Sequence, residues 1–214
     1  MVHNLGEKNS IANQYMSEIR DRTMQQDRSR FRLNVQRLGR IMATEISRDM
    51  RFTTREVETP HGIKKVSVLA EQPVLVTVLR AGFPYFEGFM DVFDQAEGGF
   101  VGAEREEGSE EISIRLGYAA APSLANRTLI LIDPMLATGR SFTRSLQTLV
   151  QKGKPRFVYI AALVSAPEGI RYLQEHVSLP YSIWTFSIDE MLDHRFYIVP
   201  GLGDAGDLSF GEKI

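Results

Sequence analysis

The segment from Leu129 to Thr143, LILIDPMLATGRSFT, constrains the fold most because its character changes twice within a short distance. Residues 128–132 form a continuously apolar run with β-branched side chains, which is typical of a strand buried on both faces of a parallel sheet. Asp133 and Pro134 end this run, since proline has no N–H group for a sheet ladder. Apolar side chains then recur at helical spacing: Phe142, Leu146, Leu149 and Val150. The segment therefore predicts a strand, a loop and a helix, and in open α/β sheets ligands bind at such loops.

The loop from Thr138 to Ser141 offers hydroxyl groups, a glycine that can adopt positive φ, and a cation. Backbone N–H groups that open a helix form an anion site, and the helix dipole adds to it. Asp133 would repel a phosphate, so its presence suits a ligand that also carries sugar hydroxyls or a metal ion. An ordinary turn, with the aspartate capping the helix, explains the same residues. The loop lacks the G-x-x-x-x-G-K-[ST] pattern, and by itself it leaves a phosphate site and a simple turn open.

The rest of the chain alternates between strand and helix patterns. An amphipathic helix is predicted over 31–46, and a β-hairpin over 55–69. Further strands are predicted at 74–79, 99–103, 112–118, 157–164 and 181–188, and further helices at 88–93 and 167–176. This alternation predicts one α/β domain over 1–214, built on a mostly parallel twisted sheet with helices on both faces.

Composition narrows the possible functions. The chain has no cysteine, which excludes disulfides, thiolate metal sites and a cysteine nucleophile. Its net charge of −2 gives no global field that would attract nucleic acid. The four histidines show no ligand spacing, so no protein-held metal is predicted. No apolar run reaches membrane-spanning length and no signal-peptide pattern is present, which predicts a cytoplasmic protein without nucleic-acid or membrane partners.

Three other stretches carry candidate chemistry. Arg80 ends a buried strand beside two small residues, so its guanidinium should meet either a bound anion or a carboxylate in a structural salt bridge. Arg105 stands among glutamates in a polar hairpin that we expect to be mobile, or in a solvated charged loop. The segment 197–211 is rich in glycine but has apolar anchors. It is either a C-terminal turn or a loop that presents peptide groups to a flat ligand such as a pyrimidine.

Four blocks in this order resemble the uracil phosphoribosyltransferases: LRAG at 79–82, DPMLATG at 133–139, APEGI at 166–170 and PGLGDAGD at 200–207. Asp-Pro stands where most phosphoribosyltransferases have two adjacent acids, and the GLGDAGD tail marks the uracil enzymes within the wider group. The resemblance runs from about residue 15 to the C-terminus. It implies the phosphoribosyltransferase fold. It also implies transfer of the 5-phosphoribosyl group from phosphoribosyl pyrophosphate to uracil, giving UMP and pyrophosphate, with Mg²⁺ accompanying the pyrophosphate.

The resemblance also implies roles for individual residues. Asp133, Arg80 and Arg105 would be the catalytic residues, Asp133 at the ribose and the two arginines at the pyrophosphate. Asp204 would contact both phosphoribosyl pyrophosphate and the base. Ala137, Thr138, Gly139, Arg140 and Ser141 would wrap the 5′-phosphate, and the phosphoribosyl pyrophosphate site would also include Pro134, Met135 and Leu136. Uracil would be bound largely through main-chain groups of Ile198, Gly203 and Ala205.

Two departures from the family pattern concern affinity. Arg140 stands where many members have a second glycine, and Glu-Arg-Glu-Glu surrounds Arg105 where many members have Tyr-Arg-Asn-Glu. The hairpin 55–69 resembles the arm by which members grip a neighbouring subunit, which predicts a homodimer or homotetramer, and 190–214 resembles a hood over the base. Some members are activated by GTP, and the residues leave this open. The alternative functions are a catalytically silent regulator of the same fold that binds UMP or RNA, and a transferase for another base. The net charge counts against the regulator, and the PGLGDAGD tail counts against another base.

Overall fold

The computed structural model describes residues 1–106 and 113–212, and the side chains of 103–116 lie outside the described part. A seven-stranded sheet in the order β1-β11-β9-β7-β4-β5-β6 forms the centre. Its strands are β1 (Val2–Asn4), β4 (Val74–Leu79), β5 (Glu97–Glu106), β6 (Ser113–Ala120), β7 (Thr128–Ile132), β9 (Phe157–Ala161) and β11 (Tyr181–Thr185). All neighbours are parallel except β5 and β6, which confirms the mostly parallel sheet.

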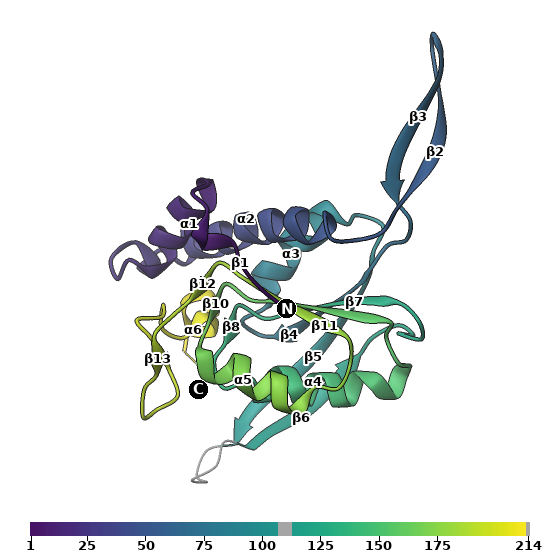
Figure 1. Cartoon of the computed structure of the whole chain (residues 1–214). Helices are drawn as coiled ribbons and strands as arrows, with labels where there is room; N and C mark the ends of the chain where they lie inside the picture. The colour runs from purple at the N-terminus through teal and green to yellow at the C-terminus, as the bar shows by residue number, and fades with distance from the viewer. Residues whose placement is uncertain (107–112, 213–214) are drawn as a thin grey trace.

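Helices cover both faces of this sheet (Figure 1). One face carries α1 (Ile11–Arg20), α2 (Arg28–Ser47) and α3 (Phe83–Val92), and the other carries α4 (Arg140–Leu149) and α5 (Pro167–His176). Because side chains alternate along a strand, each strand supplies both layers. Ile130 and Ile132 belong to the hydrophobic cluster with α1, α2 and α3, whereas Leu129 and Leu131 belong to the cluster with α4 and α5. The predicted α/β architecture with helices on both faces is confirmed.

An antiparallel hairpin of β2 (Phe52–Thr59) and β3 (Gly62–Leu69) projects away from the body (Figure 1). Every residue of β2 is exposed, so the hairpin has no core of its own. The sequence predicted this hairpin, although the first strand begins three residues before the expected Arg55. Its role as an arm between subunits stays a prediction.

A three-stranded parallel sheet lies beyond the carboxyl ends of the central strands. It consists of β8 (Met135–Leu136), β10 (Val164–Ser165) and β12 (Ser187–Ile188). The strands predicted at 157–164 and 181–188 are therefore wrong as single elements, because each is interrupted where the chain leaves the central sheet. The carbonyl of Pro134 accepts hydrogen bonds from the N–H groups of Leu163 and Val164. These bonds hold the start of β10 beside the loop after β7.

The N-terminal helix α1 and the beginning of α3 were not expected from the sequence. α1 carries buried apolar side chains at helical spacing, Ala12, Met16 and Ile19, and a capping box formed by Ser10 and Asn13 starts it. The helix predicted over 88–93 begins at Phe83, where Pro84 suits the first turn, and ends at Val92. Three short 3₁₀ helices complete the helical elements of the described residues: η1 (Leu5–Glu7), η2 (Met24–Gln26) and η3 (Val150–Lys152). Within 1–106 and 113–212, no helix combines the length and apolar character needed to cross a membrane.

The C-terminal segment folds back over the same end of the sheet. It contains the antiparallel pair β13 (Met191–Leu192) and β14 (Ile198–Val199), followed by α6 (Ala205–Phe210). Asp204 caps α6, since its Oδ1 accepts hydrogen bonds from the N–H groups of Gly206 at 2.8 Å and Asp207 at 3.0 Å. The glycine-rich tail is thus an ordered loop and a short helix, and not merely a C-terminal turn.

Candidate active site

Arg80 and Asp133 follow two neighbouring parallel strands, β4 and β7, and therefore lie at the same edge of the sheet. Thr77 of β4 pairs in register with Ile132 of β7, and its Oγ1 donates a hydrogen bond to the Ile132 carbonyl at 3.0 Å. Gly82 comes close to the same two residues, because a Cβ there would lie 2.1 Å from the Thr77 Oγ1 and 3.1 Å from the Ile132 oxygen. A glycine at this position lets the loop after β4 fold against the end of β7.

Asp133 is buried, with 9% of its surface exposed, and its Oδ1 accepts a hydrogen bond from the N–H of Met135 at 3.3 Å. The aspartate thus turns the chain into the loop and does not cap α4. That helix instead begins after Gly139, which has a φ of 77° and makes no side-chain cap. The interpretation of Asp133 as a helix cap is therefore wrong. The hydroxyl of Thr138 does serve the helix start, since it accepts from the N–H of Arg140 at 3.4 Å.

The predicted phosphate loop rests on the first turn of α5. A Cβ on Gly139 would lie 2.7 Å from the carbonyl oxygen of Gly169, and a Cβ on Gly169 would lie 2.2 Å from the carbonyl oxygen of Ala137. The APEGI block therefore supports the loop through a close contact between main chains. Leu136 has its side chain in the core, and its carbonyl accepts from the N–H of Ala166. Neither its side chain nor this hydrogen-bonded carbonyl is directed to a ligand.

Arg140 is directed towards α5. Its Cζ lies 5.9 Å from the centre of the Tyr172 ring, which is a cation–π distance. Ala137, Thr138 and Ser141 are partly exposed at the start of α4, where backbone N–H groups and hydroxyls can donate hydrogen bonds to a bound anion.

Arg80 meets a carboxylate of the C-terminal segment. Its Nη2 lies 3.1 Å from Oδ1 of Asp207 and 3.4 Å from the carbonyl of Gly211, and both charged side chains are 38% exposed. The Arg80 Nε is buried and has no hydrogen-bond partner among the described residues. The structural salt bridge considered for Arg80 therefore exists, and the half-exposed guanidinium can still meet an anion with its other N–H groups.

Arg105 lies in β5, where its backbone pairs with Ile114 of β6. β5 continues past Gly102, the partner of Leu79 at the end of β4, so the Arg105 backbone lies beyond the sheet edge that carries Arg80. The Arg105 side chain and residues 107–112, where the mobile hairpin was expected, are outside the described residues.

The C-terminal segment closes over the loop after β4. Ile198 and Ala205 are buried in one hydrophobic cluster with Leu202, and Ala81, Met135 and Ala137 pack against that cluster. A Cβ on Gly206 would lie 3.8 Å from the Ala81 Cβ, which places α6 directly on this loop. Gly203 has a φ of 94°, a value that favours glycine. The structure thus packs α6 on the loop after β4, and the cluster that contains Ile198 and Ala205 extends through the core on this face of the sheet.

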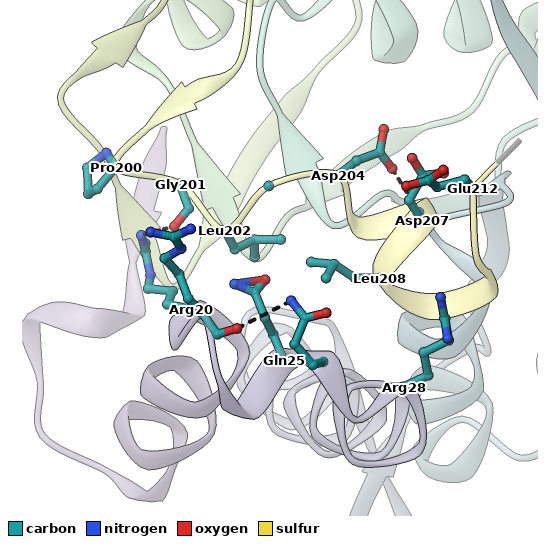
Figure 2. Close-up of a pocket in the computed structure, with 13 residues that line it drawn as sticks. Arg20, Gln25, Arg28, Pro200, Gly201, Leu202, Asp204, Asp207, Leu208 and Glu212 are labelled. Atoms are coloured by element: carbon teal, nitrogen blue, oxygen red, sulfur yellow. Dashed lines mark hydrogen bonds between the residues drawn. The ribbon is translucent and has the colours of Figure 1, made fainter.

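A cavity of about 490 Å³ lies between the C-terminal segment and the N-terminal helices (Figure 2). Asp204 lines it on one side, and Arg20, Gln25 and Arg28 line it on the other. Gly203 is also among the lining residues. None of the residues 133–141 line this cavity. It therefore adjoins the predicted base-binding segment without including the predicted phosphate loop.

A family model described as uracil phosphoribosyltransferase matches residues 7–212, nearly the whole chain. The chain belongs to the uracil phosphoribosyltransferase family. A uracil phosphoribosyltransferase of Porphyromonas gingivalis is 42% identical over 214 residues and covers 100% of this chain and 99% of its own length. A uracil phosphoribosyltransferase of Methanothermobacter thermautotrophicus is 35% identical over 206 residues. The match covers 95% of this chain and 93% of the relative. A solved structure from Aquifex aeolicus, 28% identical, superimposes with a TM-score of 0.88 and covers 100% of both chains.

For a member of the uracil phosphoribosyltransferase family, the site contains two features that sequence reasoning missed. One is the contact of Gly169 with the loop, which the APEGI match indicated by position but not by role. The other is Asp189, a buried carboxylate whose hydrogen bonds reach the C-terminal segment. Burial raises the pKa of Asp189, but hydrogen bonds from Arg20 and Ser187 outweigh it and hold the pKa below its ordinary value. No sequence pattern indicated this residue, because its charged partner, Arg20, lies 169 residues away along the chain.

Proposed function

We propose that this protein transfers the 5-phosphoribosyl group from phosphoribosyl pyrophosphate to uracil, forming UMP and pyrophosphate in pyrimidine salvage. The observation that carries the proposal is the convergence of three segments at one sheet edge. The loop after β4 carries Arg80, the loop after β7 carries Asp133, and α6 packs on the first of these loops. The family membership over 7–212 supports the assignment of the reaction.

In this reaction the bond between the anomeric carbon and the pyrophosphate oxygen breaks, and its electron pair leaves on the pyrophosphate. Uracil N1 bonds to the same carbon, and its proton passes to the departing pyrophosphate or to water. The carbon passes through an oxocarbenium-like state, so the protein acts by positioning and by electrostatics. We assign Asp133 to the ribose, and Arg80 and Arg105 to the departing pyrophosphate. We assign the N–H groups and hydroxyls of the loop up to Ser141 to the 5′-phosphate.

The base would be selected by peptide groups. Main-chain atoms of Ile198, Gly203 and Ala205 would pair with the donor and acceptor edge of uracil, and Asp204 would lie beside the ribose and the pyrophosphate. Cytosine would place its exocyclic amine against a donor, and a buried mismatch of this kind discriminates strongly. Selection therefore depends on how rigidly this segment is held.

Mg²⁺ would enter with the pyrophosphate of the substrate and would offset its charge. Such an ion typically keeps phosphate oxygens, waters and one or two carboxylates as ligands. The described residues contain no group of three or more acidic or histidine side chains that could hold a metal alone. Single carboxylates such as Asp133 fit an ion carried by the substrate. The cytoplasmic location and the homodimer or homotetramer stay predictions.

The decisive experiment is incubation of the purified chain with radiolabelled uracil, phosphoribosyl pyrophosphate and Mg²⁺. Formation of labelled UMP, abolished by EDTA, is the expected result. Turnover of hypoxanthine without turnover of uracil would instead show a transferase for another base. Inactivity with every base, together with tight binding of UMP or RNA, would show a regulator of the same fold.

A further inference from the structure

Arg20, the last residue of α1, forms a bidentate ion pair with Asp189. Its Nη1 lies 2.8 Å from the Asp189 Oδ2, and its Nη2 lies 2.8 Å from Oδ1. The Asp189 side chain is 4% exposed and the Arg20 side chain 23% exposed. Paired geometry of this kind, shielded from water, is the strong form of a charge-assisted hydrogen bond.

The same two side chains hold both peptide groups of Gly201. The Arg20 Nη1 donates to the Gly201 carbonyl at 2.9 Å, and the Gly201 N–H donates to the Asp189 Oδ2 at 2.8 Å. The hydroxyl of Ser187 donates to the Asp189 Oδ1 at 2.6 Å. Each carboxylate oxygen therefore accepts two hydrogen bonds, which is the condition under which a buried ion pair is well compensated.

Gly201 sits at a sharp turn of the C-terminal segment. It has a φ of 59°, and a Cβ there would lie 2.1 Å from the carbonyl oxygen of Ile198. Ile198 and Gly203, which the proposed function assigns to uracil, stand three residues before it and two residues after it. Fixing both peptide groups of Gly201 therefore fixes the main chain between two predicted contacts of the base.

We propose that Arg20 and Asp189 are positioning residues that hold the main chain of 198–203 in the geometry that recognises the base, although neither touches a substrate. This inference rests on the proposed function. Peptide groups have no side-chain rotamers with which to adjust, so a displacement of the segment would weaken every contact with the base together. Displacements of about 1 Å can cost on the order of 100-fold in rate.

The kinetic test compares three variants with the wild-type protein: Arg20→Gln, Asp189→Asn and the double variant. Each single variant should raise the KM for uracil about 10-fold or more, while the KM for phosphoribosyl pyrophosphate stays within roughly twofold. The double variant should be no worse than the poorer single variant, because residues that act as one unit are not additive. Arg20→Lys keeps the charge but cannot form the bidentate pair, and should fall between wild type and Arg20→Gln.

Glu18→Gln is the matched control. Glu18 lies on the same helix, is 6% exposed and accepts hydrogen bonds from Arg30 and Asn34, none of which reach 198–203. The Glu18→Gln substitution should leave the KM for uracil unchanged. The inference would be overturned if Arg20→Gln raised the KM for uracil and the KM for phosphoribosyl pyrophosphate equally. It would also be overturned if Glu18→Gln raised the KM for uracil as much as Arg20→Gln does, because the ion pair would then have only a general structural role.

Hydrogen exchange without substrates separates this inference from the proposed function. Peptides that cover 198–203 should exchange faster in Arg20→Gln and Arg20→Lys than in wild type or Glu18→Gln. Unchanged exchange overturns the positioning role, whatever the activity. If the wild-type protein turns over no uracil, the proposed function fails. Faster exchange would then still support the structural role of the pair, for a different ligand.

Discussion

Arg80 and Asp207 are 127 residues apart in the chain, yet the Nη2 of the arginine lies 3.1 Å from a carboxylate oxygen of the aspartate. The ion pair joins the loop after β4 to α6, the last helix of the described chain. The arginine predicted to meet the pyrophosphate is thus held by a group from the segment predicted to meet the base. The ion pair therefore joins the two predicted substrate regions.

Asp207→Asn should raise the KM for phosphoribosyl pyrophosphate about 3- to 10-fold, because a guanidinium without its carboxylate is less well positioned for an anion. Stability should barely change, since a half-exposed pair contributes about 0–1 kcal/mol. Steady-state kinetics and thermal unfolding measure the two effects. Asp91→Asn is the control, as Asp91 forms a comparably exposed pair with Arg40 on the surface of α2 and α3. A KM that is unchanged by Asp207→Asn would contradict the positioning of Arg80.

Asp133→Asn and Arg105→Ala should each lower turnover while leaving the fold intact. The first variant removes the charge that we assign to the ribose, and the second removes a cation that we assign to the departing pyrophosphate. Loss of one such electrostatic contact costs about 100-fold or more in rate. UMP formation measures the loss, and circular dichroism checks the fold. Full activity in either variant would show that the role assigned to that residue is wrong.

Gly169→Ala should lower kcat/KM for phosphoribosyl pyrophosphate by roughly 10- to 100-fold, since the loop must move to make room. The new Cβ would lie 2.2 Å from the carbonyl oxygen of Ala137, which is main chain and cannot rotate away. Gly117→Ala is the control, because a Cβ there meets nothing within 4 Å. Equal kinetics in both alanine variants would mean that the contact between α5 and the loop is not needed.

Acid should weaken the folded state partly through Glu18. The hydrogen bond from Arg30 is the main cause that lowers the pKa of Glu18 from 4.5 to about 2. As the pH falls, the Glu18 carboxylate therefore takes up a proton in the unfolded chain before it does so in the folded protein. The contribution of Glu18 to the free energy of unfolding is complete above pH 4.5 and is lost as the pH falls towards 2. Urea unfolding between pH 3 and 6 should show a flatter pH dependence for Glu18→Gln than for wild type. An unchanged pH dependence in Glu18→Gln would show that Glu18 makes no contribution to the acid sensitivity of the fold.

Ile63→Asp should weaken self-association without affecting the folding of the monomer. Ile63 is 71% exposed near the tip of the hairpin, where the predicted arm would bury it against a second copy. Losing such burial costs about 1.5–3 kcal/mol, or roughly 10- to 100-fold in the dissociation constant. Sedimentation velocity of the wild-type and variant proteins at matched concentrations measures their self-association. An unchanged oligomer would show that the hairpin is not the contact.

The elements that the sequence predicted best are those whose pattern is fully local. β4, β7 and α5 have the predicted bounds, because a buried apolar run or a proline-started amphipathic helix determines its own ends. The divisions of 157–164 and 181–188 could not be predicted in this way. They depend on hydrogen bonds from another segment, such as those from Leu163 and Val164 to the Pro134 carbonyl.

The candidate site was predictable where the loops carry recognisable residue types and unpredictable where it depends on long-range pairs. Asp133 and Arg80 lie at one sheet edge, as expected from strands that neighbour each other. Asp207 belongs to the PGLGDAGD block, but its role was not predicted, and no motif indicated Asp189, because an aspartate acquires such a role only from the arginine that the fold places beside it. The role of Arg20 was not predicted for the same reason, although its helix α1 carries a local signal in the capping box of Ser10 and Asn13.

The division of the interior by the central sheet has a practical consequence for directed evolution. Consecutive residues of β7 face opposite layers, so Ile130 and Leu131 are adjacent in sequence but contact different sets of helices. Substitutions without shared partners tend to combine additively. Variant libraries for the two layers can accordingly be screened in parallel and merged afterwards, with alternate residues of each strand assigned to different libraries.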